Sequence, residues 1–159
     1  MLKLKTTRYR MGNKYNAQKA KGYTSGRIYD SKAERDRAEV LKLDETAGKI
    51  SHFSEQPKVN LTKFHTFKPD YVYMENGRLV FEDCKGVESD RFKINKKLWR
   101  ERGPGVLRIS KRAGKYGKWN LKDLHPEIID STMWDGYKDF ADILVNSKAI
   151  KQPKEEVKE

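Results

Sequence analysis

Two acidic residues and a lysine in the middle of the chain lie where a predicted hairpin would bring them together. Residues 66–85 read TFKPDYVYMENGRLVFEDCK, and the Asn-Gly pair in this segment is a strong signal for a two-residue hairpin turn. With that pair in the turn, Asp70 faces Asp83 across the two strands, with Cβ atoms about 4.5–5.5 Å apart. Lys85 follows on the same face, diagonal to Asp70 and within its reach. The hairpin therefore predicts a cluster of two carboxylates and one ammonium group.

The facing carboxylates indicate a divalent cation. Like charges in directly opposed positions destabilise a hairpin, and a cation between them removes the repulsion. Mg²⁺ takes one or two carboxylates together with water and phosphate oxygens, and we expect Mn²⁺ to substitute for it. Apolar residues on the same face place the acids at the border of the core, and Gly86 leaves room for a phosphate beside Lys85. The alternative is a solvated polar end of the hairpin, in a chain with 36% charged residues.

This cluster suits phosphodiester hydrolysis. A bound Mg²⁺ polarises a phosphoryl oxygen and lowers the pKa of an attacking water. We expect Lys85 to orient that water or to stabilise the developing charge, because neighbouring carboxylates favour its charged form and oppose a role as a base. Glu82 has the opposite parity in its strand, so it is expected on the other face, pointing outward or supporting the ligands.

The residues before this hairpin predict a helix. Ser31 is a good N-cap, Glu34 occupies the capping-box position three residues later, and Gly48 marks the C-terminal end. Glu34 lies two turns before Leu41, so it can face inward. The predicted apolar stripe contains Ala33, Val40, Leu43 and Ala47, with Leu41 at its edge.

The remaining elements predict a small α/β domain with a mixed sheet. The predicted strands cover residues 50–55, 57–61, 66–73, 78–85 and 106–110. A second helix is expected over 90–102, a basic loop over 111–119 and a third helix over 131–146. The chain divides into a basic flexible arm (1–28), a single domain (29–147) and a charged, disordered tail (148–159).

Two segments resemble known nucleases. Pro69-Asp70 followed by Asp83-Cys84-Lys85 resembles the PD-(D/E)XK nuclease signature, and this likeness implies a restriction-endonuclease-like αβββαβ core, here with an extra C-terminal helix. KPDYVYMENGRLVFEDCKG and DSKAERDRAEV are similar to segments of the phage endonuclease I family of Holliday-junction resolvases. That family carries Glu where this chain has Asp83, and the superfamily accepts both. The likeness implies four catalytic residues, Glu34, Asp70, Asp83 and Lys85, and a metal bound by Asp70, Asp83, the backbone carbonyl of Cys84 and Glu34.

The resemblance also implies a substrate and an assembly. It predicts a Mg²⁺-dependent, structure-selective DNA endonuclease that cuts four-way junctions. It predicts a homodimer, with the first helix exchanged between two chains. Two alternatives stay open: a nicking or restriction-like endonuclease of the same superfamily, and a non-catalytic basic DNA-binding accessory protein.

The charge of the chain independently indicates a polyanionic partner. It contains 35 Lys and Arg against 23 Asp and Glu, a formal net charge of +12, which favours nucleic acid. No apolar run approaches the roughly 18 residues of a membrane span, and the single Cys84 indicates a reducing, cytoplasmic setting, that of the host cell if the chain is phage-encoded. The predicted DNA contacts are Lys96, Lys97, Arg100, Lys111, Arg112, Lys115 and Lys118.

Overall fold

A five-stranded mixed sheet organises residues 17–114 and 117–127, the part of the chain that the computed structural model describes. Its strand order is β3-β6-β7-β8-β9, with β7 and β8 parallel and the other neighbours antiparallel. The strands are β3 (Ser51–Glu55), β6 (Tyr71–Glu75), β7 (Arg78–Cys84), β8 (Val106–Ala113) and β9 (Lys118–Leu124). The helices are α1 (Lys32–Thr46) and α2 (Asp90–Arg102). Two small hairpins complete the fold: β1 (Ala20–Lys21) with β2 (Ile28–Tyr29), and β4 (Val59–Thr62) with β5 (His65–Phe67).

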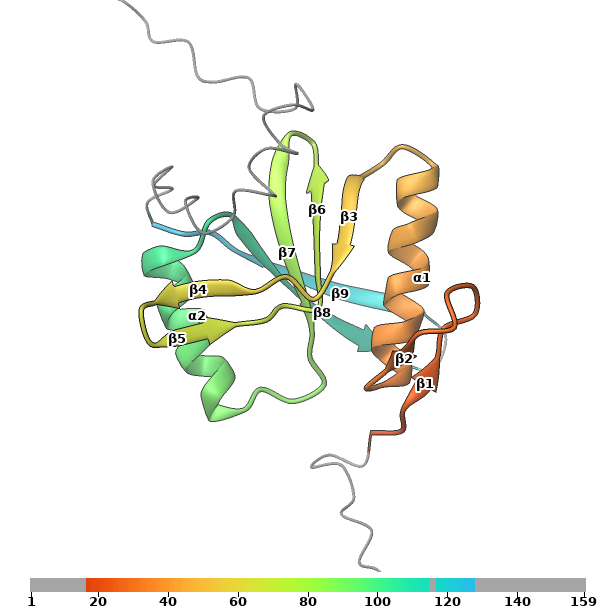
Figure 1. Ribbon diagram of the computed structural model, residues 1–159, viewed down its shortest axis with the longest axis horizontal. Coiled ribbons are helices and arrows are strands. Elements are labelled where there is room, and N and C mark those ends of the chain that lie inside the picture. The colour runs from red at the N-terminus through yellow and green to blue at the C-terminus, as the bar shows by residue number, and fades with distance from the viewer. Residues whose placement is uncertain (1–16, 115–116, 128–159) are drawn as a thin grey trace, which may run out of the picture.

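The two helices cover opposite faces of the sheet. In Figure 1, α1 lies beside β3 with the β1–β2 hairpin at its start, and α2 lies on the other side, where the β4–β5 hairpin crosses it. Alternate residues of β6 and β7 belong to different apolar clusters, as expected for successive strand residues. Phe92 and Trp99 of α2 pack on one face, and Ala38 and Leu41 of α1 pack on the other. The prediction of an α/β chain with a mixed sheet is confirmed.

The register of the β6–β7 hairpin is the predicted one. It runs from Tyr71 opposite Glu82 to Glu75 opposite Arg78, and both turn residues have positive φ, as a two-residue turn of this kind requires. The strand predicted over 66–73 is wrong in its extent, however, because it is divided into the end of β5 and the start of β6. Pro69 lies in the interruption and has no N–H to donate to a strand partner. Asp70 therefore lies just before the first paired residue of β6.

The helix α1 begins as predicted and buries a different face. Ser31 is its N-cap, and the Ser31 side chain accepts a hydrogen bond from the backbone N–H of Glu34. The predicted apolar stripe is wrong: Leu43 is 69% exposed, whereas the buried residues of α1 are Arg37, Ala38 and Leu41. The helix is rotated because Arg37 forms an ion pair with a buried acid of the sheet.

Two segments predicted without regular structure form hairpins. The basic loop predicted over 111–119 is wrong, because β8 continues to Ala113 and β9 begins at Lys118. Gly114 and Gly117, between these strands, both have positive φ. The predicted arm includes residues 20–28, which instead belong to the β1–β2 hairpin.

Several predictions fall outside the described ranges. These are the arm residues 1–16, the helix 131–146 and the tail 148–159. Neither α1 nor α2, the helices of the described ranges, is long and apolar enough to cross a membrane.

Candidate active site

The open end of the β6–β7 hairpin brings Asp70, Asp83 and Lys85 close together. The backbone N–H of Cys84 donates a 2.7 Å hydrogen bond to Oδ2 of Asp70, which ties Asp70 to the end of β7. Asp83, one residue before, is 1% exposed. Nζ of Lys85 lies 2.8 Å from Oδ2 of Asp83 and 5.2 Å from the ring centroid of Phe92. Asp70, Asp83 and Lys85 therefore form one cluster at the edge of the core.

Asp83 is a buried acid with an incomplete set of partners. Its Oδ2 accepts no hydrogen bond of normal geometry from any described residue, although the Lys85 ammonium is close. Burial raises the pKa of Asp83 to about 6, even though the charge of Lys85 acts to lower it. A buried carboxylate oxygen that is approached by an ammonium group and accepts no well-formed hydrogen bond is a suitable ligand for a cation.

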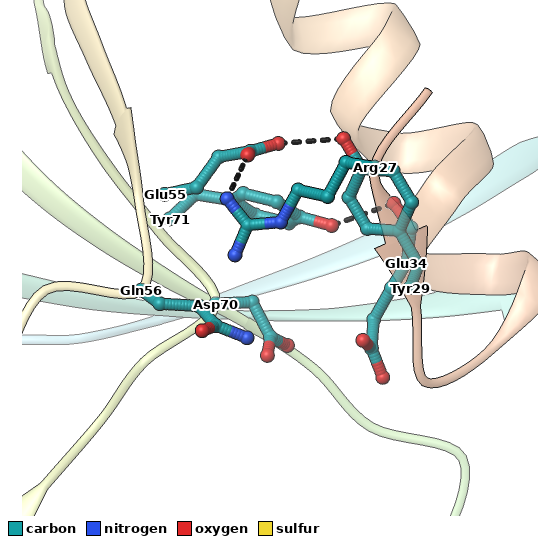
Figure 2. A pocket seen from close by; sticks show the side chains of 7 residues that line it. All are labelled: Arg27, Tyr29, Glu34, Glu55, Gln56, Asp70 and Tyr71. Carbon is teal, nitrogen blue, oxygen red and sulfur yellow. Dashed lines mark hydrogen bonds and ion pairs between the residues drawn. The ribbon is translucent and has the colours of Figure 1, made fainter. Parts of the chain in front are cut away.

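Asp70 and Glu34 add negative charge to the same place. Burial raises the pKa of Asp70 well above its ordinary value, and the charges of Asp83 and Glu34 raise it further. Figure 2 shows the carboxylates of Glu34 and Asp70 pointing to the same side. Glu34 is held by Ser31, whose hydroxyl donates to Oε1 over 3.1 Å, and by Tyr71, whose hydroxyl donates to the Glu34 backbone carbonyl over 2.6 Å. Burial also raises the pKa of Glu34.

These carboxylates do not form a complete protein-only metal cage. No group of three or more His, Cys, Asp or Glu side chains that could hold a metal ion is found between residues 17 and 114 or between 117 and 127. Mg²⁺ commonly uses one or two carboxylates and fills its other positions with water and phosphate oxygens. Asp70 and Asp83 form a pair of this kind, and they stay predicted ligands, as do Glu34 and the Cys84 carbonyl.

Lys85 is a cation in this setting. Burial acts to lower its pKa, but the charge and proximity of Asp83 outweigh that effect and the pKa is raised. Burial raises the pKa of the Cys84 thiol well above its ordinary value, which disfavours the thiolate form that a nucleophile needs. Its Sγ lies 3.2 Å from Oγ of Ser110 on β8.

Glu82 does not point outward, contrary to one of the two sequence expectations. It is fully buried, and Arg37 of α1 donates to both of its oxygens over 2.5 and 3.0 Å. The Tyr73 hydroxyl donates to Glu82 over 2.5 Å, and Arg108 donates to that hydroxyl over 3.2 Å. This network fixes α1 on the sheet one turn after Glu34.

Sequence reasoning missed the residues around Glu34 and Asp70. Figure 2 shows a small pocket to which Arg27, Tyr29, Glu55 and Gln56 contribute together with Tyr71. Arg27 and the Tyr29 hydroxyl both bind the Glu55 carboxylate. No local pattern marks these residues, since they come from the β1–β2 hairpin and the end of β3.

The predicted DNA contacts are distributed over two regions. On α2, Lys97 and Arg100 are exposed, and Lys96 binds Glu88 over 2.5 Å. Near the β8–β9 turn, Lys111 and Lys118 are exposed and Arg112 binds Asp36 over 2.8 Å, while Lys115 lies outside the described residues.

The fold and the cluster define an α/β domain with a buried Asp83, a partly buried Asp70 and a lysine at one end of its sheet. The chain belongs to a protein family of unknown function, DUF1064, whose sequence profile matches residues 12–118. No curated protein and no solved structure matches the chain significantly. The family match includes all four predicted catalytic residues.

Proposed function

We propose that this protein is a Mg²⁺-dependent DNA endonuclease of the PD-(D/E)XK kind, and that it acts on branched DNA as a Holliday-junction resolvase. One observation carries the proposal: Asp83 is buried beside Asp70 and Lys85, and its Oδ2 is approached by the Lys85 ammonium but accepts no hydrogen bond of normal geometry from a described residue. A structural acid in such a position is normally satisfied by protein donors. A bound cation would offset the repulsion between the two neighbouring carboxylates.

The order of elements supports the same superfamily. Without the two small hairpins and the terminal β9, the chain reads α1, β3, β6, β7, α2, β8, which is the αβββαβ order that the resemblance implies. Asp70 precedes the second strand of this core, and Asp83 and Lys85 lie at the end of the third. This agreement makes a restriction-endonuclease-like core our proposed fold.

Asp70 and Asp83 would hold the metal, together with the Cys84 carbonyl and Glu34. The cation supplies Lewis-acid polarisation of the scissile phosphate and an activated water when it is bound. Lys85 keeps its proton and contributes positive charge beside the phosphate, where it stabilises charge that develops in the transition state. Tyr71 and Ser31 hold the first turn of α1, so that Glu34 is positioned with little freedom.

A junction resolvase needs two opposed nicks, and a two-fold homodimer supplies two sites in the matching relation. Glu34 lies beside Asp70 of the same chain, and we therefore propose that each site is assembled within one chain, without exchange of the first helix. The dimer is part of the proposal. The runner-up is a nicking endonuclease with the same site. A purely DNA-binding accessory protein is disfavoured, because opposed carboxylates weaken binding to phosphate.

The test is cleavage of a supercoiled plasmid that bears a cruciform, in Mg²⁺ and in EDTA. We expect wild-type protein to linearise the plasmid in Mg²⁺ only, and Asp70→Asn and Lys85→Ala to abolish cleavage while DNA binding persists. Glu101→Gln, which changes an exposed acid of α2, is the matched control and should cleave as wild type does. Full activity of Asp70→Asn would overturn the site, and nicked circles without linear product would favour the runner-up.

A further inference from the structure

A cavity of about 120 Å³ opens beside Lys85, and none of its lining residues is shared with the pocket around Arg27. The strands β7 and β8 are parallel, so their carboxyl ends meet at one edge of the sheet, where β9 also begins. The N-terminal turn of α1 closes this edge. The lining includes Ala33, Lys85, Gly86, Lys111, Arg112 and Trp119.

The side chain of Trp119 lines the cavity, and a neighbouring arginine holds it in place. Trp119 is half-buried, and the guanidinium of Arg37 lies 5.6 Å from its ring centroid. Arg37 is itself fixed by both oxygens of buried Glu82. The indole therefore has a defined position. Aromatic side chains fixed in this way are the platforms on which unpaired bases stack.

The rim of the cavity is basic. Lys111 is exposed, and Arg112 is held in place by Asp36. Lys85 lines the cavity and also lies against Asp83, and Cys84, whose carbonyl is a predicted metal ligand, lines the cavity too, so the cavity adjoins the candidate metal site. A Cβ built on Gly86 would meet no atom within 4 Å, so the backbone there is open to a ligand. Cations around an aromatic wall suit a nucleotide better than a free phosphate ion.

We propose that this cavity binds one unpaired nucleotide of the DNA strand, with the base against Trp119 and its phosphates beside Lys111 and Arg112. A base inside a duplex is stacked between its neighbours and cannot enter such a cavity without being extruded. The cavity thus favours DNA that carries an unpaired nucleotide next to the scissile phosphate. This inference rests on the proposed function, because it places the nucleotide beside the same Lys85.

The first experiment uses the full chain in EDTA, so that binding is measured without cleavage. Oligonucleotides carry the fluorescent base 2-aminopurine, either in one unpaired position beside a duplex or at the same position inside a fully paired duplex. Wild-type protein should quench the unpaired probe by contact with Trp119 and leave the paired probe unchanged. Equal quenching of both probes, or none, would overturn the proposal without any variant being made.

The second experiment compares variants by fluorescence anisotropy. Trp119→Ala should weaken binding of the unpaired probe on the order of 10-fold and leave duplex affinity unchanged, and Trp119→Phe should restore most of the loss. The control is Phe64→Ala, which removes a 91% exposed aromatic side chain between β4 and β5. Circular dichroism checks that each variant is folded. If Trp119→Phe is folded and loses the same affinity for both probes, the cavity does not select unpaired DNA.

The proposed nuclease activity and the proposed nucleotide-binding cavity are refuted by different results. Selective binding of the unpaired probe without cleavage in Mg²⁺ would refute the nuclease and support the cavity. Cleavage in Mg²⁺ with identical binding of both probes by wild type would refute the cavity and support the nuclease.

Discussion

Replacing Asp83 by Asn should stabilise the metal-free protein while abolishing cleavage. Asn has nearly the same shape as Asp and carries no charge. Asp83 is 1% exposed, and burial raises its pKa to about 6 from about 3.9 in an unfolded chain. A shift of about two units corresponds to about 3 kcal/mol of folding free energy lost when the carboxylate is charged. The Asn variant does not bear this loss.

The effect has a defined pH dependence. Because the folded pKa of Asp83 is raised, its folded state holds the proton more tightly than the unfolded chain between about pH 4 and pH 6. The stability of the wild type therefore falls as the pH rises through this window, relative to the variant. We expect equal stabilities near pH 4, and a variant more stable by up to about 3 kcal/mol at pH 8. The value is an upper limit, because the variant leaves Lys85 without its carboxylate partner.

The assay is urea unfolding followed by circular dichroism, in EDTA, at several pH values between 4 and 8. Added Mg²⁺ should stabilise the wild type and not Asp83→Asn, because only the wild type retains both carboxylates. Asp123→Asn is the control of opposite sign. Arg108 lowers the pKa of Asp123, so its charged form stabilises the fold above the unfolded pKa and this variant should lose stability there. An Asp83→Asn protein that is less stable than wild type at pH 8 would refute the reasoning.

Three further predictions follow from other parts of the structure. Glu82→Ala leaves the buried Arg37 without its partner and should lower the free energy of unfolding by about 3–5 kcal/mol; an unchanged urea midpoint would contradict the ion pair. The logarithm of the DNA binding constant should fall linearly with the logarithm of the salt concentration, with a slope of about −0.9 for each phosphate contact; a flat dependence would exclude a nucleic-acid partner. Mixing Glu34→Ala chains with Lys85→Ala chains should restore no cleavage, because Glu34 lies beside Asp70 of its own chain; recovered nicking would show that the first helix is exchanged.

The parts of the fold predicted from sequence depend on local signals. The Asn-Gly turn set the register of β6 and β7, and this register identified Asp83 and not Glu82 as the partner of Asp70. Ser31 caps α1 as predicted, and Ser89 caps α2 in the same way, because each side chain needs only a backbone N–H three residues later. Interactions of this range are determined by a few neighbouring residues.

The parts that sequence reasoning missed depend on distant segments. Glu82 lies on the second buried face, and Arg37 compensates its charge from 45 positions away. A signal was present, since β6 and β7 read as nearly continuous apolar runs, which is typical of strands covered on both faces. Arg27 and Glu55 reach the pocket around Asp70 through tertiary packing, which no periodicity within either segment encodes.

Dependence on distant segments also explains two wrong predictions: the apolar stripe of α1 and the loop in place of the β8–β9 hairpin. Leu43 fits a helical apolar pattern, but the ion pair of Arg37 turns another face of the helix to the sheet. Residues 111–119 are rich in Lys and Gly and lack apolar alternation, yet β8 continues to Ala113 because β9 pairs with it. Strand pairing of this kind is a property of the assembled sheet.

The most direct test of the proposed activity is a single gel assay of DNA cleavage. Wild-type protein and Asp83→Asn are each incubated with a four-way junction and with a linear duplex of the same sequence, in Mg²⁺ and in EDTA. We predict cleavage of the junction by the wild type in Mg²⁺ alone, much weaker cleavage of the duplex, and no cleavage by Asp83→Asn although it still retards the junction. Intact junction in Mg²⁺, or equal cleavage by Asp83→Asn, would contradict the assignment of this carboxylate cluster as a nuclease active site.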